Sequence, residues 1–136
     1  MEQTYQTLIA ELLDAAKSAG ASGADAMLAR GQSTSVSIRH GKVESSERSE
    51  DFDIGLRGFV GQQTASISTS QLDADNIKDL AARAVAMAKL APEDPYVKLA
   101  SADQLAQHIP TLDIFDAEQP DADRLRQRAS EAEASA

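Results

Sequence analysis

The stretch SIRHGKVESSE, residues 37–47, lies between two runs of alternating residues and decides how this part of the chain folds. Just before the turn, Val36 and Ile38 fall on one face of an extended chain, while the serines beside them fall on the other. His40 and Gly41 suit a two-residue connection, because glycine accepts a positive φ freely and histidine enters the left-handed region more readily than most residues. The stretch therefore predicts a β-hairpin that turns at His40 and Gly41.

The acids of the same stretch suggest a competing interpretation, in which His40 is a metal ligand or an acid/base group. If residues 42–49 are extended, Glu44 and Glu47 point to opposite faces, because alternate side chains of a strand do so. Two carboxylates on opposite faces cannot converge on one ligand. We therefore favour the turn over a ligand role for His40.

Short β-branched or serine-rich runs fill residues 25–69 and are separated by turn-forming residues. We expect the strands to be interrupted at Gly31, at residues 40–41, at residues 51–53 and at residues 61–63. These runs predict a meander of antiparallel strands. Alternation of apolar and polar residues indicates that one face of the sheet is covered and that the other meets water or a partner.

Helices are expected both before and after the strand region in the sequence. Apolar residues at helical spacing predict helices at about 4–19 and about 73–90, and Asp73 is a suitable N-cap for the second. A capping box predicts a short helix at about 102–108, and an alanine stripe predicts a helix at about 121–136 that we expect to be truncated. The predicted fold class is α/β of the α+β type, with an antiparallel meander and helices packed on one face. Residues 1–136 form a single domain in this interpretation.

Composition excludes several classes of function. The chain has 136 residues, of which 42% are hydrophobic, and a net charge of -9 from 22 acidic and 13 basic residues. That charge repels phosphate backbones and anionic membrane surfaces, and the 4% of aromatic residues offer few platforms on which bases could stack. No apolar run approaches the ~18 residues of a membrane span, and the N-terminus lacks the basic region of a signal peptide. We therefore expect a cytoplasmic location and neither a nucleic-acid nor a membrane partner.

Catalytic chemistry is hard to assemble from the residues present. A metallopeptidase site needs two histidines a helical turn apart with a glutamate between them, and His40 and His108 satisfy neither condition. There is no cysteine, and no GxSxG motif surrounds a serine. We expect no catalytic residue, no metal ligand and no cofactor in this chain.

Glycines 55, 58 and 61 raise the possibility of a phosphate-binding loop, but the following helix and the Lys-Ser/Thr pair of such loops are missing. Glycine within a strand more often marks a bulge, a bend or a close backbone contact. Arg57, which lies between two of these glycines, could reach the carboxylate of a bound peptide or form a salt bridge with a nearby acid.

The serine-rich run at residues 64–68 is the best candidate for a binding strand. If it lies at a sheet edge, its backbone can pair with an extended peptide, and its small side chains would accept many sequences. The alternative is that these side chains only face water. The candidate peptide-docking residues are Thr64, Ala65, Ser66, Ile67, Ser68 and Arg57.

Four stretches together resemble the N-terminal region of the TldD/PmbA family, and more closely its PmbA, or TldE, branch. They are STSVSIRHGKVESSERSED (33–51), GLRGFVGQQTASISTSQLDADNI (55–77), LAPEDPY (90–96) and PTLDIFD (110–116). The resemblance implies the N-terminal domain of a larger, two-domain chain. It also implies a heterodimer in which a TldD-like subunit carries a zinc-binding HExxxH motif.

The function that this resemblance implies is that of a non-catalytic domain in a zinc metallopeptidase complex that processes or degrades peptides. The expected partners are a TldD-like subunit, which would hold the zinc, and unfolded or extended peptides. The family is also labelled a modulator of DNA gyrase. The alternative it implies is an acidic binding module that regulates gyrase.

Overall fold

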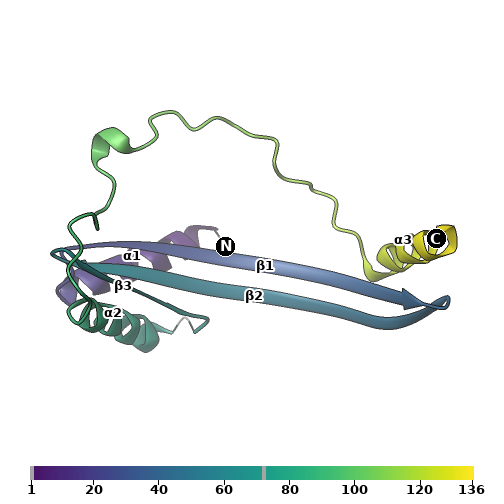
Figure 1. Ribbon diagram of the computed structural model, residues 1–136, viewed down its shortest axis with the longest axis horizontal. Coiled ribbons are helices and arrows are strands. Elements are labelled where there is room, and N and C mark those ends of the chain that lie inside the picture. Colours follow the sequence, from purple (N-terminus) through teal and green to yellow (C-terminus); the bar gives the residue numbers. More distant parts are fainter. Residues whose placement is uncertain (1, 72) are drawn as a thin grey trace. The chain divides into compact units, whose positions relative to one another are not determined.

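The structure is a computed structural model that describes residues 2–71 and 73–136 (Figure 1). Its elements are α1 (Glu2–Ser18), β1 (Gly23–Arg39), β2 (Lys42–Val60), β3 (Gln63–Thr69), α2 (Ala74–Ala88), the 3-10 helix η1 (Ala102–Gln104) and α3 (Ala122–Ser135). The strands form one sheet in the order β1-β2-β3, and β3 runs antiparallel to β2. The predicted α+β fold with an antiparallel meander is confirmed. Among the described residues, no helix is long and apolar enough to cross a membrane.

The chain divides into two compact units. Unit one contains Met1–Ala29 and Phe52–Leu105, and unit two contains Arg30–Asp51 and Ala106–Ala136. Strands β1 and β2 each contribute residues to both units. The hydrophobic core lies in unit one.

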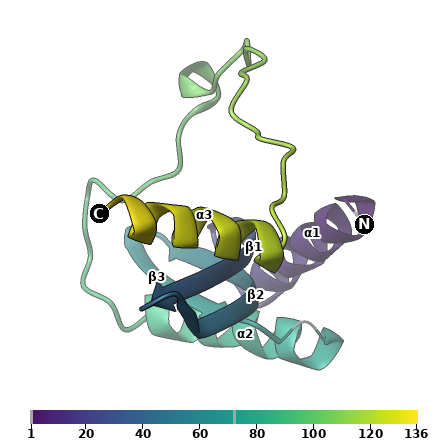
Figure 2. The ribbon, with the colours of Figure 1, turned by 90° about the vertical axis from the view of Figure 1, so that its right-hand side faces the viewer.

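In unit one, α1 and α2 pack beside each other on one face of the sheet, as predicted (Figure 2). Ile54 and Leu56 are two residues apart on β2, so they point to the same face, and they are 0% and 1% exposed. The rest of the central cluster comes from the two helices: Leu12, Ala16, Ile77, Leu80, Ala81 and Ala84. Alanines let α2 approach closely, since a Cβ added to Gly58 of β2 would lie 3.8 Å from the Cβ of Ala84.

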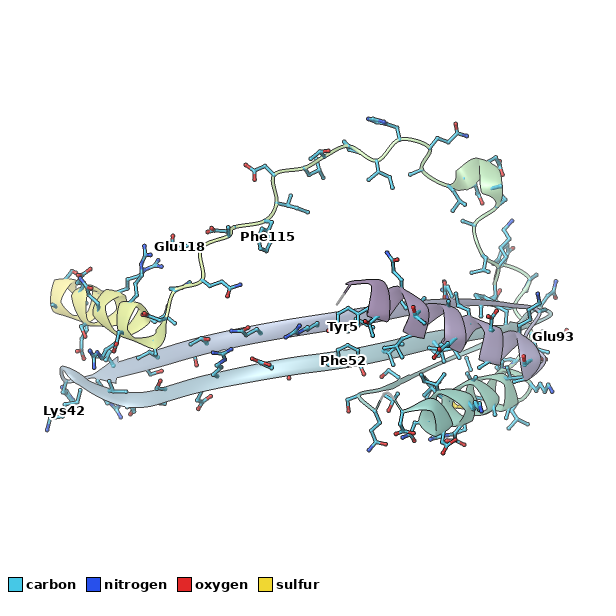
Figure 3. All side chains as sticks on the ribbon, turned by 180° about the vertical axis from the view of Figure 1, so that it is seen from behind. Tyr5, Lys42, Phe52, Glu93, Phe115 and Glu118 are labelled. Carbon is cyan, nitrogen blue, oxygen red and sulfur yellow. The ribbon has the colours of Figure 1, made fainter. Side chains whose placement is uncertain are left out.

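At the start of α1, an aromatic pair extends this packing. The rings of Tyr5 and Phe52 lie 5.8 Å apart between centroids and are tilted by 39° (Figure 3). Such a tilted pair buries apolar surface and adds a modest electrostatic attraction. Tyr5 therefore helps to hold the first turns of α1 on β2.

The start of α2 follows the prediction. The Asp73 side chain accepts a hydrogen bond from the backbone N–H of Asn76 at 3.0 Å, which satisfies one of the free donors of the first turn. This hydrogen bond lowers the pKa of Asp73, because it favours the ionised carboxylate. The helix ends at Ala88, and Lys89 is its C-cap.

Both hairpin turns are made by residues that tolerate positive φ. His40 and Gly41 have φ values of 52° and 70°, so the predicted turn is confirmed and has the character of type I′. Gly61 has a φ of 61° and occupies the first central position of a two-residue turn that Val60 and Gln63 close. This arrangement matches a type II′ turn.

Two predicted strand interruptions were wrong. Strand β1 continues through Gly31, and strand β2 continues through residues 51–53. Glycine and aspartate have low strand propensity, but that preference is weak and yields to backbone pairing with a neighbouring strand. Residues 40–41 do interrupt the strands as predicted, because their positive φ values end the strand pairing there.

The prediction of a short helix at about 102–108 was also wrong, because the structure has in this range only the single turn Ala102–Gln104. Its capping box forms as expected, and the backbone N–H of Ser101 donates to the Gln104 side chain at 3.0 Å. No residue of this turn is buried. A helix without a packed apolar face lacks the contacts that stabilise further turns, so the chain becomes extended at Leu105.

Candidate functional site

The predicted docking run at residues 64–68 lies in β3, which is an edge strand. Within the described sheet β3 pairs with β2 alone, so its other side has no strand beside it. Arg57 of β2 lies directly opposite Ser66 in the register. The structure therefore brings the predicted arginine and the predicted serine run together.

The predicted residues do not all share one surface. Thr64, Ser66 and Ser68 alternate along β3 and lie on the face opposite the helices. Ile67 points the other way and packs against the core, and Ala65 shares its face because it lies opposite Gly58. Of the predicted residues, only Thr64, Ser66, Ser68 and Arg57 have side chains on the open face.

The turn at Gly61 also fixes which backbone groups of β3 point outward. In an antiparallel pair, hydrogen-bonded and non-hydrogen-bonded residue pairs alternate, and a two-residue turn is closed by a hydrogen-bonded pair. Counting from Val60 and Gln63, the pair of Arg57 with Ser66 is not hydrogen-bonded. The N–H and C=O of Ser66 therefore point away from β2, toward the free edge. The same holds for Thr64 and Ser68.

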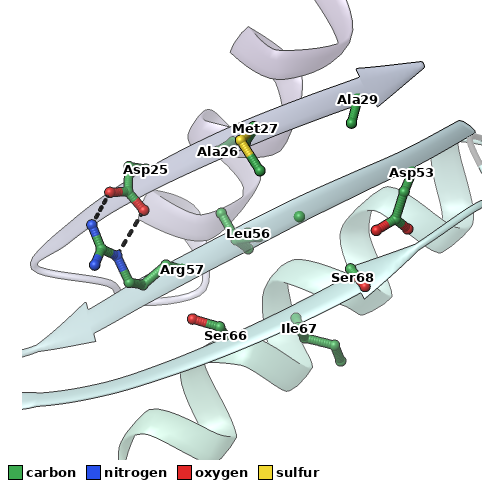
Figure 4. Close-up of a pocket in the computed structure, with 11 residues that line it drawn as sticks. Asp25, Ala26, Met27, Ala29, Asp53, Leu56, Arg57, Ser66, Ile67 and Ser68 are labelled. Atoms are coloured by element: carbon green, nitrogen blue, oxygen red, sulfur yellow. Dashed lines mark hydrogen bonds and ion pairs between the residues drawn. The ribbon is translucent and has the colours of Figure 1, made fainter. Parts of the chain in front are cut away.

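A shallow hollow of about 610 Å³ lies on this open face of unit one (Figure 4). All three strands line it, with side chains that include those of Asp25, Met27, Asp53, Arg57, Ser66 and Ser68. Gly55 contributes no side chain, so the sheet backbone forms part of the floor. Met27 of β1 is 73% exposed and offers a flexible apolar surface on the open face, across β2 from the serine run.

An ion pair between Asp25 and Arg57 closes one end of the hollow (Figure 4). The Arg57 Nε donates to Asp25 Oδ1 at 3.0 Å, and its Nη2 donates to Oδ2. These bonds to Asp25 raise the pKa of Arg57 and hold its guanidinium 5.2 Å from the centroid of the Phe59 ring. Arg57 thus forms a salt bridge, but with Asp25 and not with an acid near it in the sequence. A peptide carboxylate would have to compete with Asp25 for Arg57.

Sequence reasoning missed Asp25, Met27 and Asp53. Alternation along residues 25–29 could have placed Asp25 and Met27 on one face, but no signal in the sequence shows which strand residue they lie beside. Asp25 and Arg57 are 32 positions apart in the chain. Their pairing depends on the register between β1 and β2.

The open face carries groups that can hold an extended chain. The free edge of β3 offers outward backbone donors and acceptors, and the open face offers small hydroxyl side chains and one exposed methionine. Among residues 2–71 and 73–136, no three side chains of His, Asp or Glu gather closely enough to hold a metal ion. The free edge of β3 instead presents the kind of backbone groups that strand addition requires.

Comparison with known proteins adds the evolutionary context. Residues 24–88 match the family model described as PmbA/TldA metallopeptidase domain 1. The Metalloprotease PmbA homolog of Haemophilus influenzae is 32% identical over 135 residues, which cover 99% of this chain and 30% of that protein. The Metalloprotease PmbA of Escherichia coli O157:H7 is 28% identical over 114 residues, which cover 84% and 25%.

A solved structure from Bacteroides thetaiotaomicron, whose description proposes a modulator of DNA gyrase, shares the fold with a TM-score of 0.75. It is 20% identical, and the match covers 82% of this chain and 25% of that one. The chain thus spans about 30% or less of the length of the relatives it matches.

Proposed function

Because the chain belongs to the PmbA/TldD family, with residues 24–88 forming the family's first domain, we propose that it is the non-catalytic N-terminal domain of a PmbA-type subunit. That subunit would act in the cytoplasm in a zinc metallopeptidase heterodimer that processes or degrades peptides. The observation that carries this proposal is the 32% identity to the Metalloprotease PmbA homolog of Haemophilus influenzae across 99% of the chain.

The role proposed for this domain within the complex is to hold extended peptides. Edge strand β3 has outward backbone groups at Thr64, Ser66 and Ser68, and strand addition needs such groups. Backbone pairing gives affinity without selecting a sequence, and small side chains avoid clashes with the peptide. Arg57 contributes indirectly in this proposal, since its positive charge neutralises that of Asp25 at the end of the hollow.

The zinc of the proposed complex does not fit the described residues of this chain. His40 sits in a hairpin turn, and His108 lies in a stretch without helix or strand. No cluster of three ligand-type side chains forms in the described part of the chain. The proposal therefore assigns the zinc and its chemistry to a TldD-like partner and derives no catalytic step here.

The isolated chain is expected neither to bind zinc stoichiometrically nor to hydrolyse unstructured peptides. A catalytic zinc site needs three protein ligands and a positioned base, and the described residues do not assemble them. Equilibrium dialysis against zinc, followed by a peptide-cleavage assay, checks both statements. Tight one-to-one binding together with cleavage would show that this chain is itself catalytic.

Regulation of DNA gyrase is the alternative function. It is supported by the description of the solved Bacteroides protein and by the net charge of -9. An acidic protein can mimic the charge of DNA, but the acids here are spread over helix faces and turns, which is ordinary for a solvated surface.

A pull-down from cell extract with this chain as bait distinguishes the two functions. The proposed complex predicts recovery of a TldD-like subunit, because the domain would be part of an obligate pair. Recovery of gyrase without such a subunit would contradict the peptidase assignment and support the alternative. The same bait, unfolded before the pull-down, controls for capture by unfolded chain.

A further inference from the structure

The turn at the tip of the β1–β2 hairpin holds a carboxylate. The backbone N–H groups of His40 and Gly41 donate to the two carboxylate oxygens of Glu133, at 2.6 Å and 2.9 Å. Both turn residues have positive φ, and consecutive N–H groups in such turns converge on one side and form an anion-binding concavity. Glu133 belongs to α3 and lies in unit two with the hairpin tip.

Helix α3 follows β1 toward this tip. Near its start, Leu125 lines a small hollow with Gln32 and Thr34 of β1, and near its end Glu133 reaches the turn.

The attachment between α3 and the hairpin is otherwise weak. No residue of α3 is buried, and Leu125 and Ala129 on the helix and Val36 and Ile38 on β1 are only half-buried. A two-stranded hairpin by itself is marginally stable in water. The stretch before α3, residues 105–121, contains no helix or strand in the structure.

We propose that the hairpin tip is a carboxylate-binding site and that α3 is a detachable strap seated in it through Glu133. When seated, the strap covers the face of β1 that carries Val36 and Ile38. When released, it leaves that face and the two N–H groups at His40 and Gly41 open. The strap thus controls access to an apolar hairpin surface.

Hydrogen exchange of single amides, measured by NMR on the full chain, tests this proposal. In the wild type, the amides of His40 and Gly41 are expected to exchange about tenfold more slowly than in Glu133→Ala, because hydrogen bonds to charged groups are strong. The matched control is Glu131→Ala, which removes an acid of the same helix whose side chain bonds Gln127. The control is expected to keep wild-type protection. Equal exchange of both amides in the wild type and in Glu133→Ala would overturn the site.

Addition of a peptide tests whether the strap detaches. A synthetic peptide of residues 121–136, added to the Glu133→Ala chain, is expected to restore protection at His40 and Gly41. The same peptide carrying Glu133→Ala is expected to leave their exchange unchanged. Restoration by both peptides would overturn the role of the carboxylate, and restoration by neither would overturn the detachable strap.

Discussion

Replacement of Leu56 by alanine is expected to lower the free energy of unfolding by about 3 kcal/mol, since buried leucine-to-alanine changes remove packing and leave a cavity. Leu56 is 1% exposed and lies between β2 and the two helices that cover it. Its neighbours on α2 include Ala81 and Ala84, whose short side chains cannot extend into the space. Chemical denaturation followed by circular dichroism measures the loss.

The control for this prediction is Leu90→Ala. Leu90 is 87% exposed, so its truncation is expected to change the free energy of unfolding by no more than about 0.5 kcal/mol. If the two variants lost the same stability, Leu56 would not belong to the core. The packing of α1 and α2 on a single face would then be wrong.

Proline at Ile67 is expected to cost at least about 3 kcal/mol, whereas proline at the adjacent Ser66 is expected to leave the fold intact. Proline removes a backbone donor and is tolerated in sheets only where that donor faces away from the ladder. The register places the N–H of Ile67 in the ladder opposite Leu56 and that of Ser66 at the free edge. Ile67 also packs against the core.

Thermal unfolding of the two proline variants checks this contrast, with Ile67→Ala included to separate the lost side chain from the lost donor. Similar destabilisation by Ser66→Pro and Ile67→Pro would mean that the outward direction of the Ser66 donor is wrong. The proposed pairing of peptides along this edge would then lose its structural basis.

Local chemistry made much of the fold predictable from the sequence. The turn at His40 and Gly41 follows from which residues accept positive φ, and the start of α2 follows from Asp73 as a cap. Both depend on residues close in sequence. The uninterrupted strands through Gly31 and residues 51–53 were not predictable in the same way, because pairing with a distant strand overrides a weak local preference.

The candidate site was predicted in part for a related reason. Arg57 and the serine run could be selected from the sequence, and alternation would have assigned Ile67 to the covered face had it been applied within the run. Asp25 and Met27 could not be assigned to the site, because the register between strands decides which residues meet. The edge position of β3 likewise emerges only from the strand order.

The affinity of the intact two-subunit complex for an unstructured, fluorescently labelled peptide tests the central proposal most directly. The complex would carry either the wild-type domain or a folded Ser66→Pro domain, with Ser66→Ala as the control that keeps the backbone donor. Loss of one backbone hydrogen bond predicts about tenfold weaker binding for Ser66→Pro and unchanged binding for Ser66→Ala. Full affinity of the Ser66→Pro complex would contradict peptide pairing through that donor of β3.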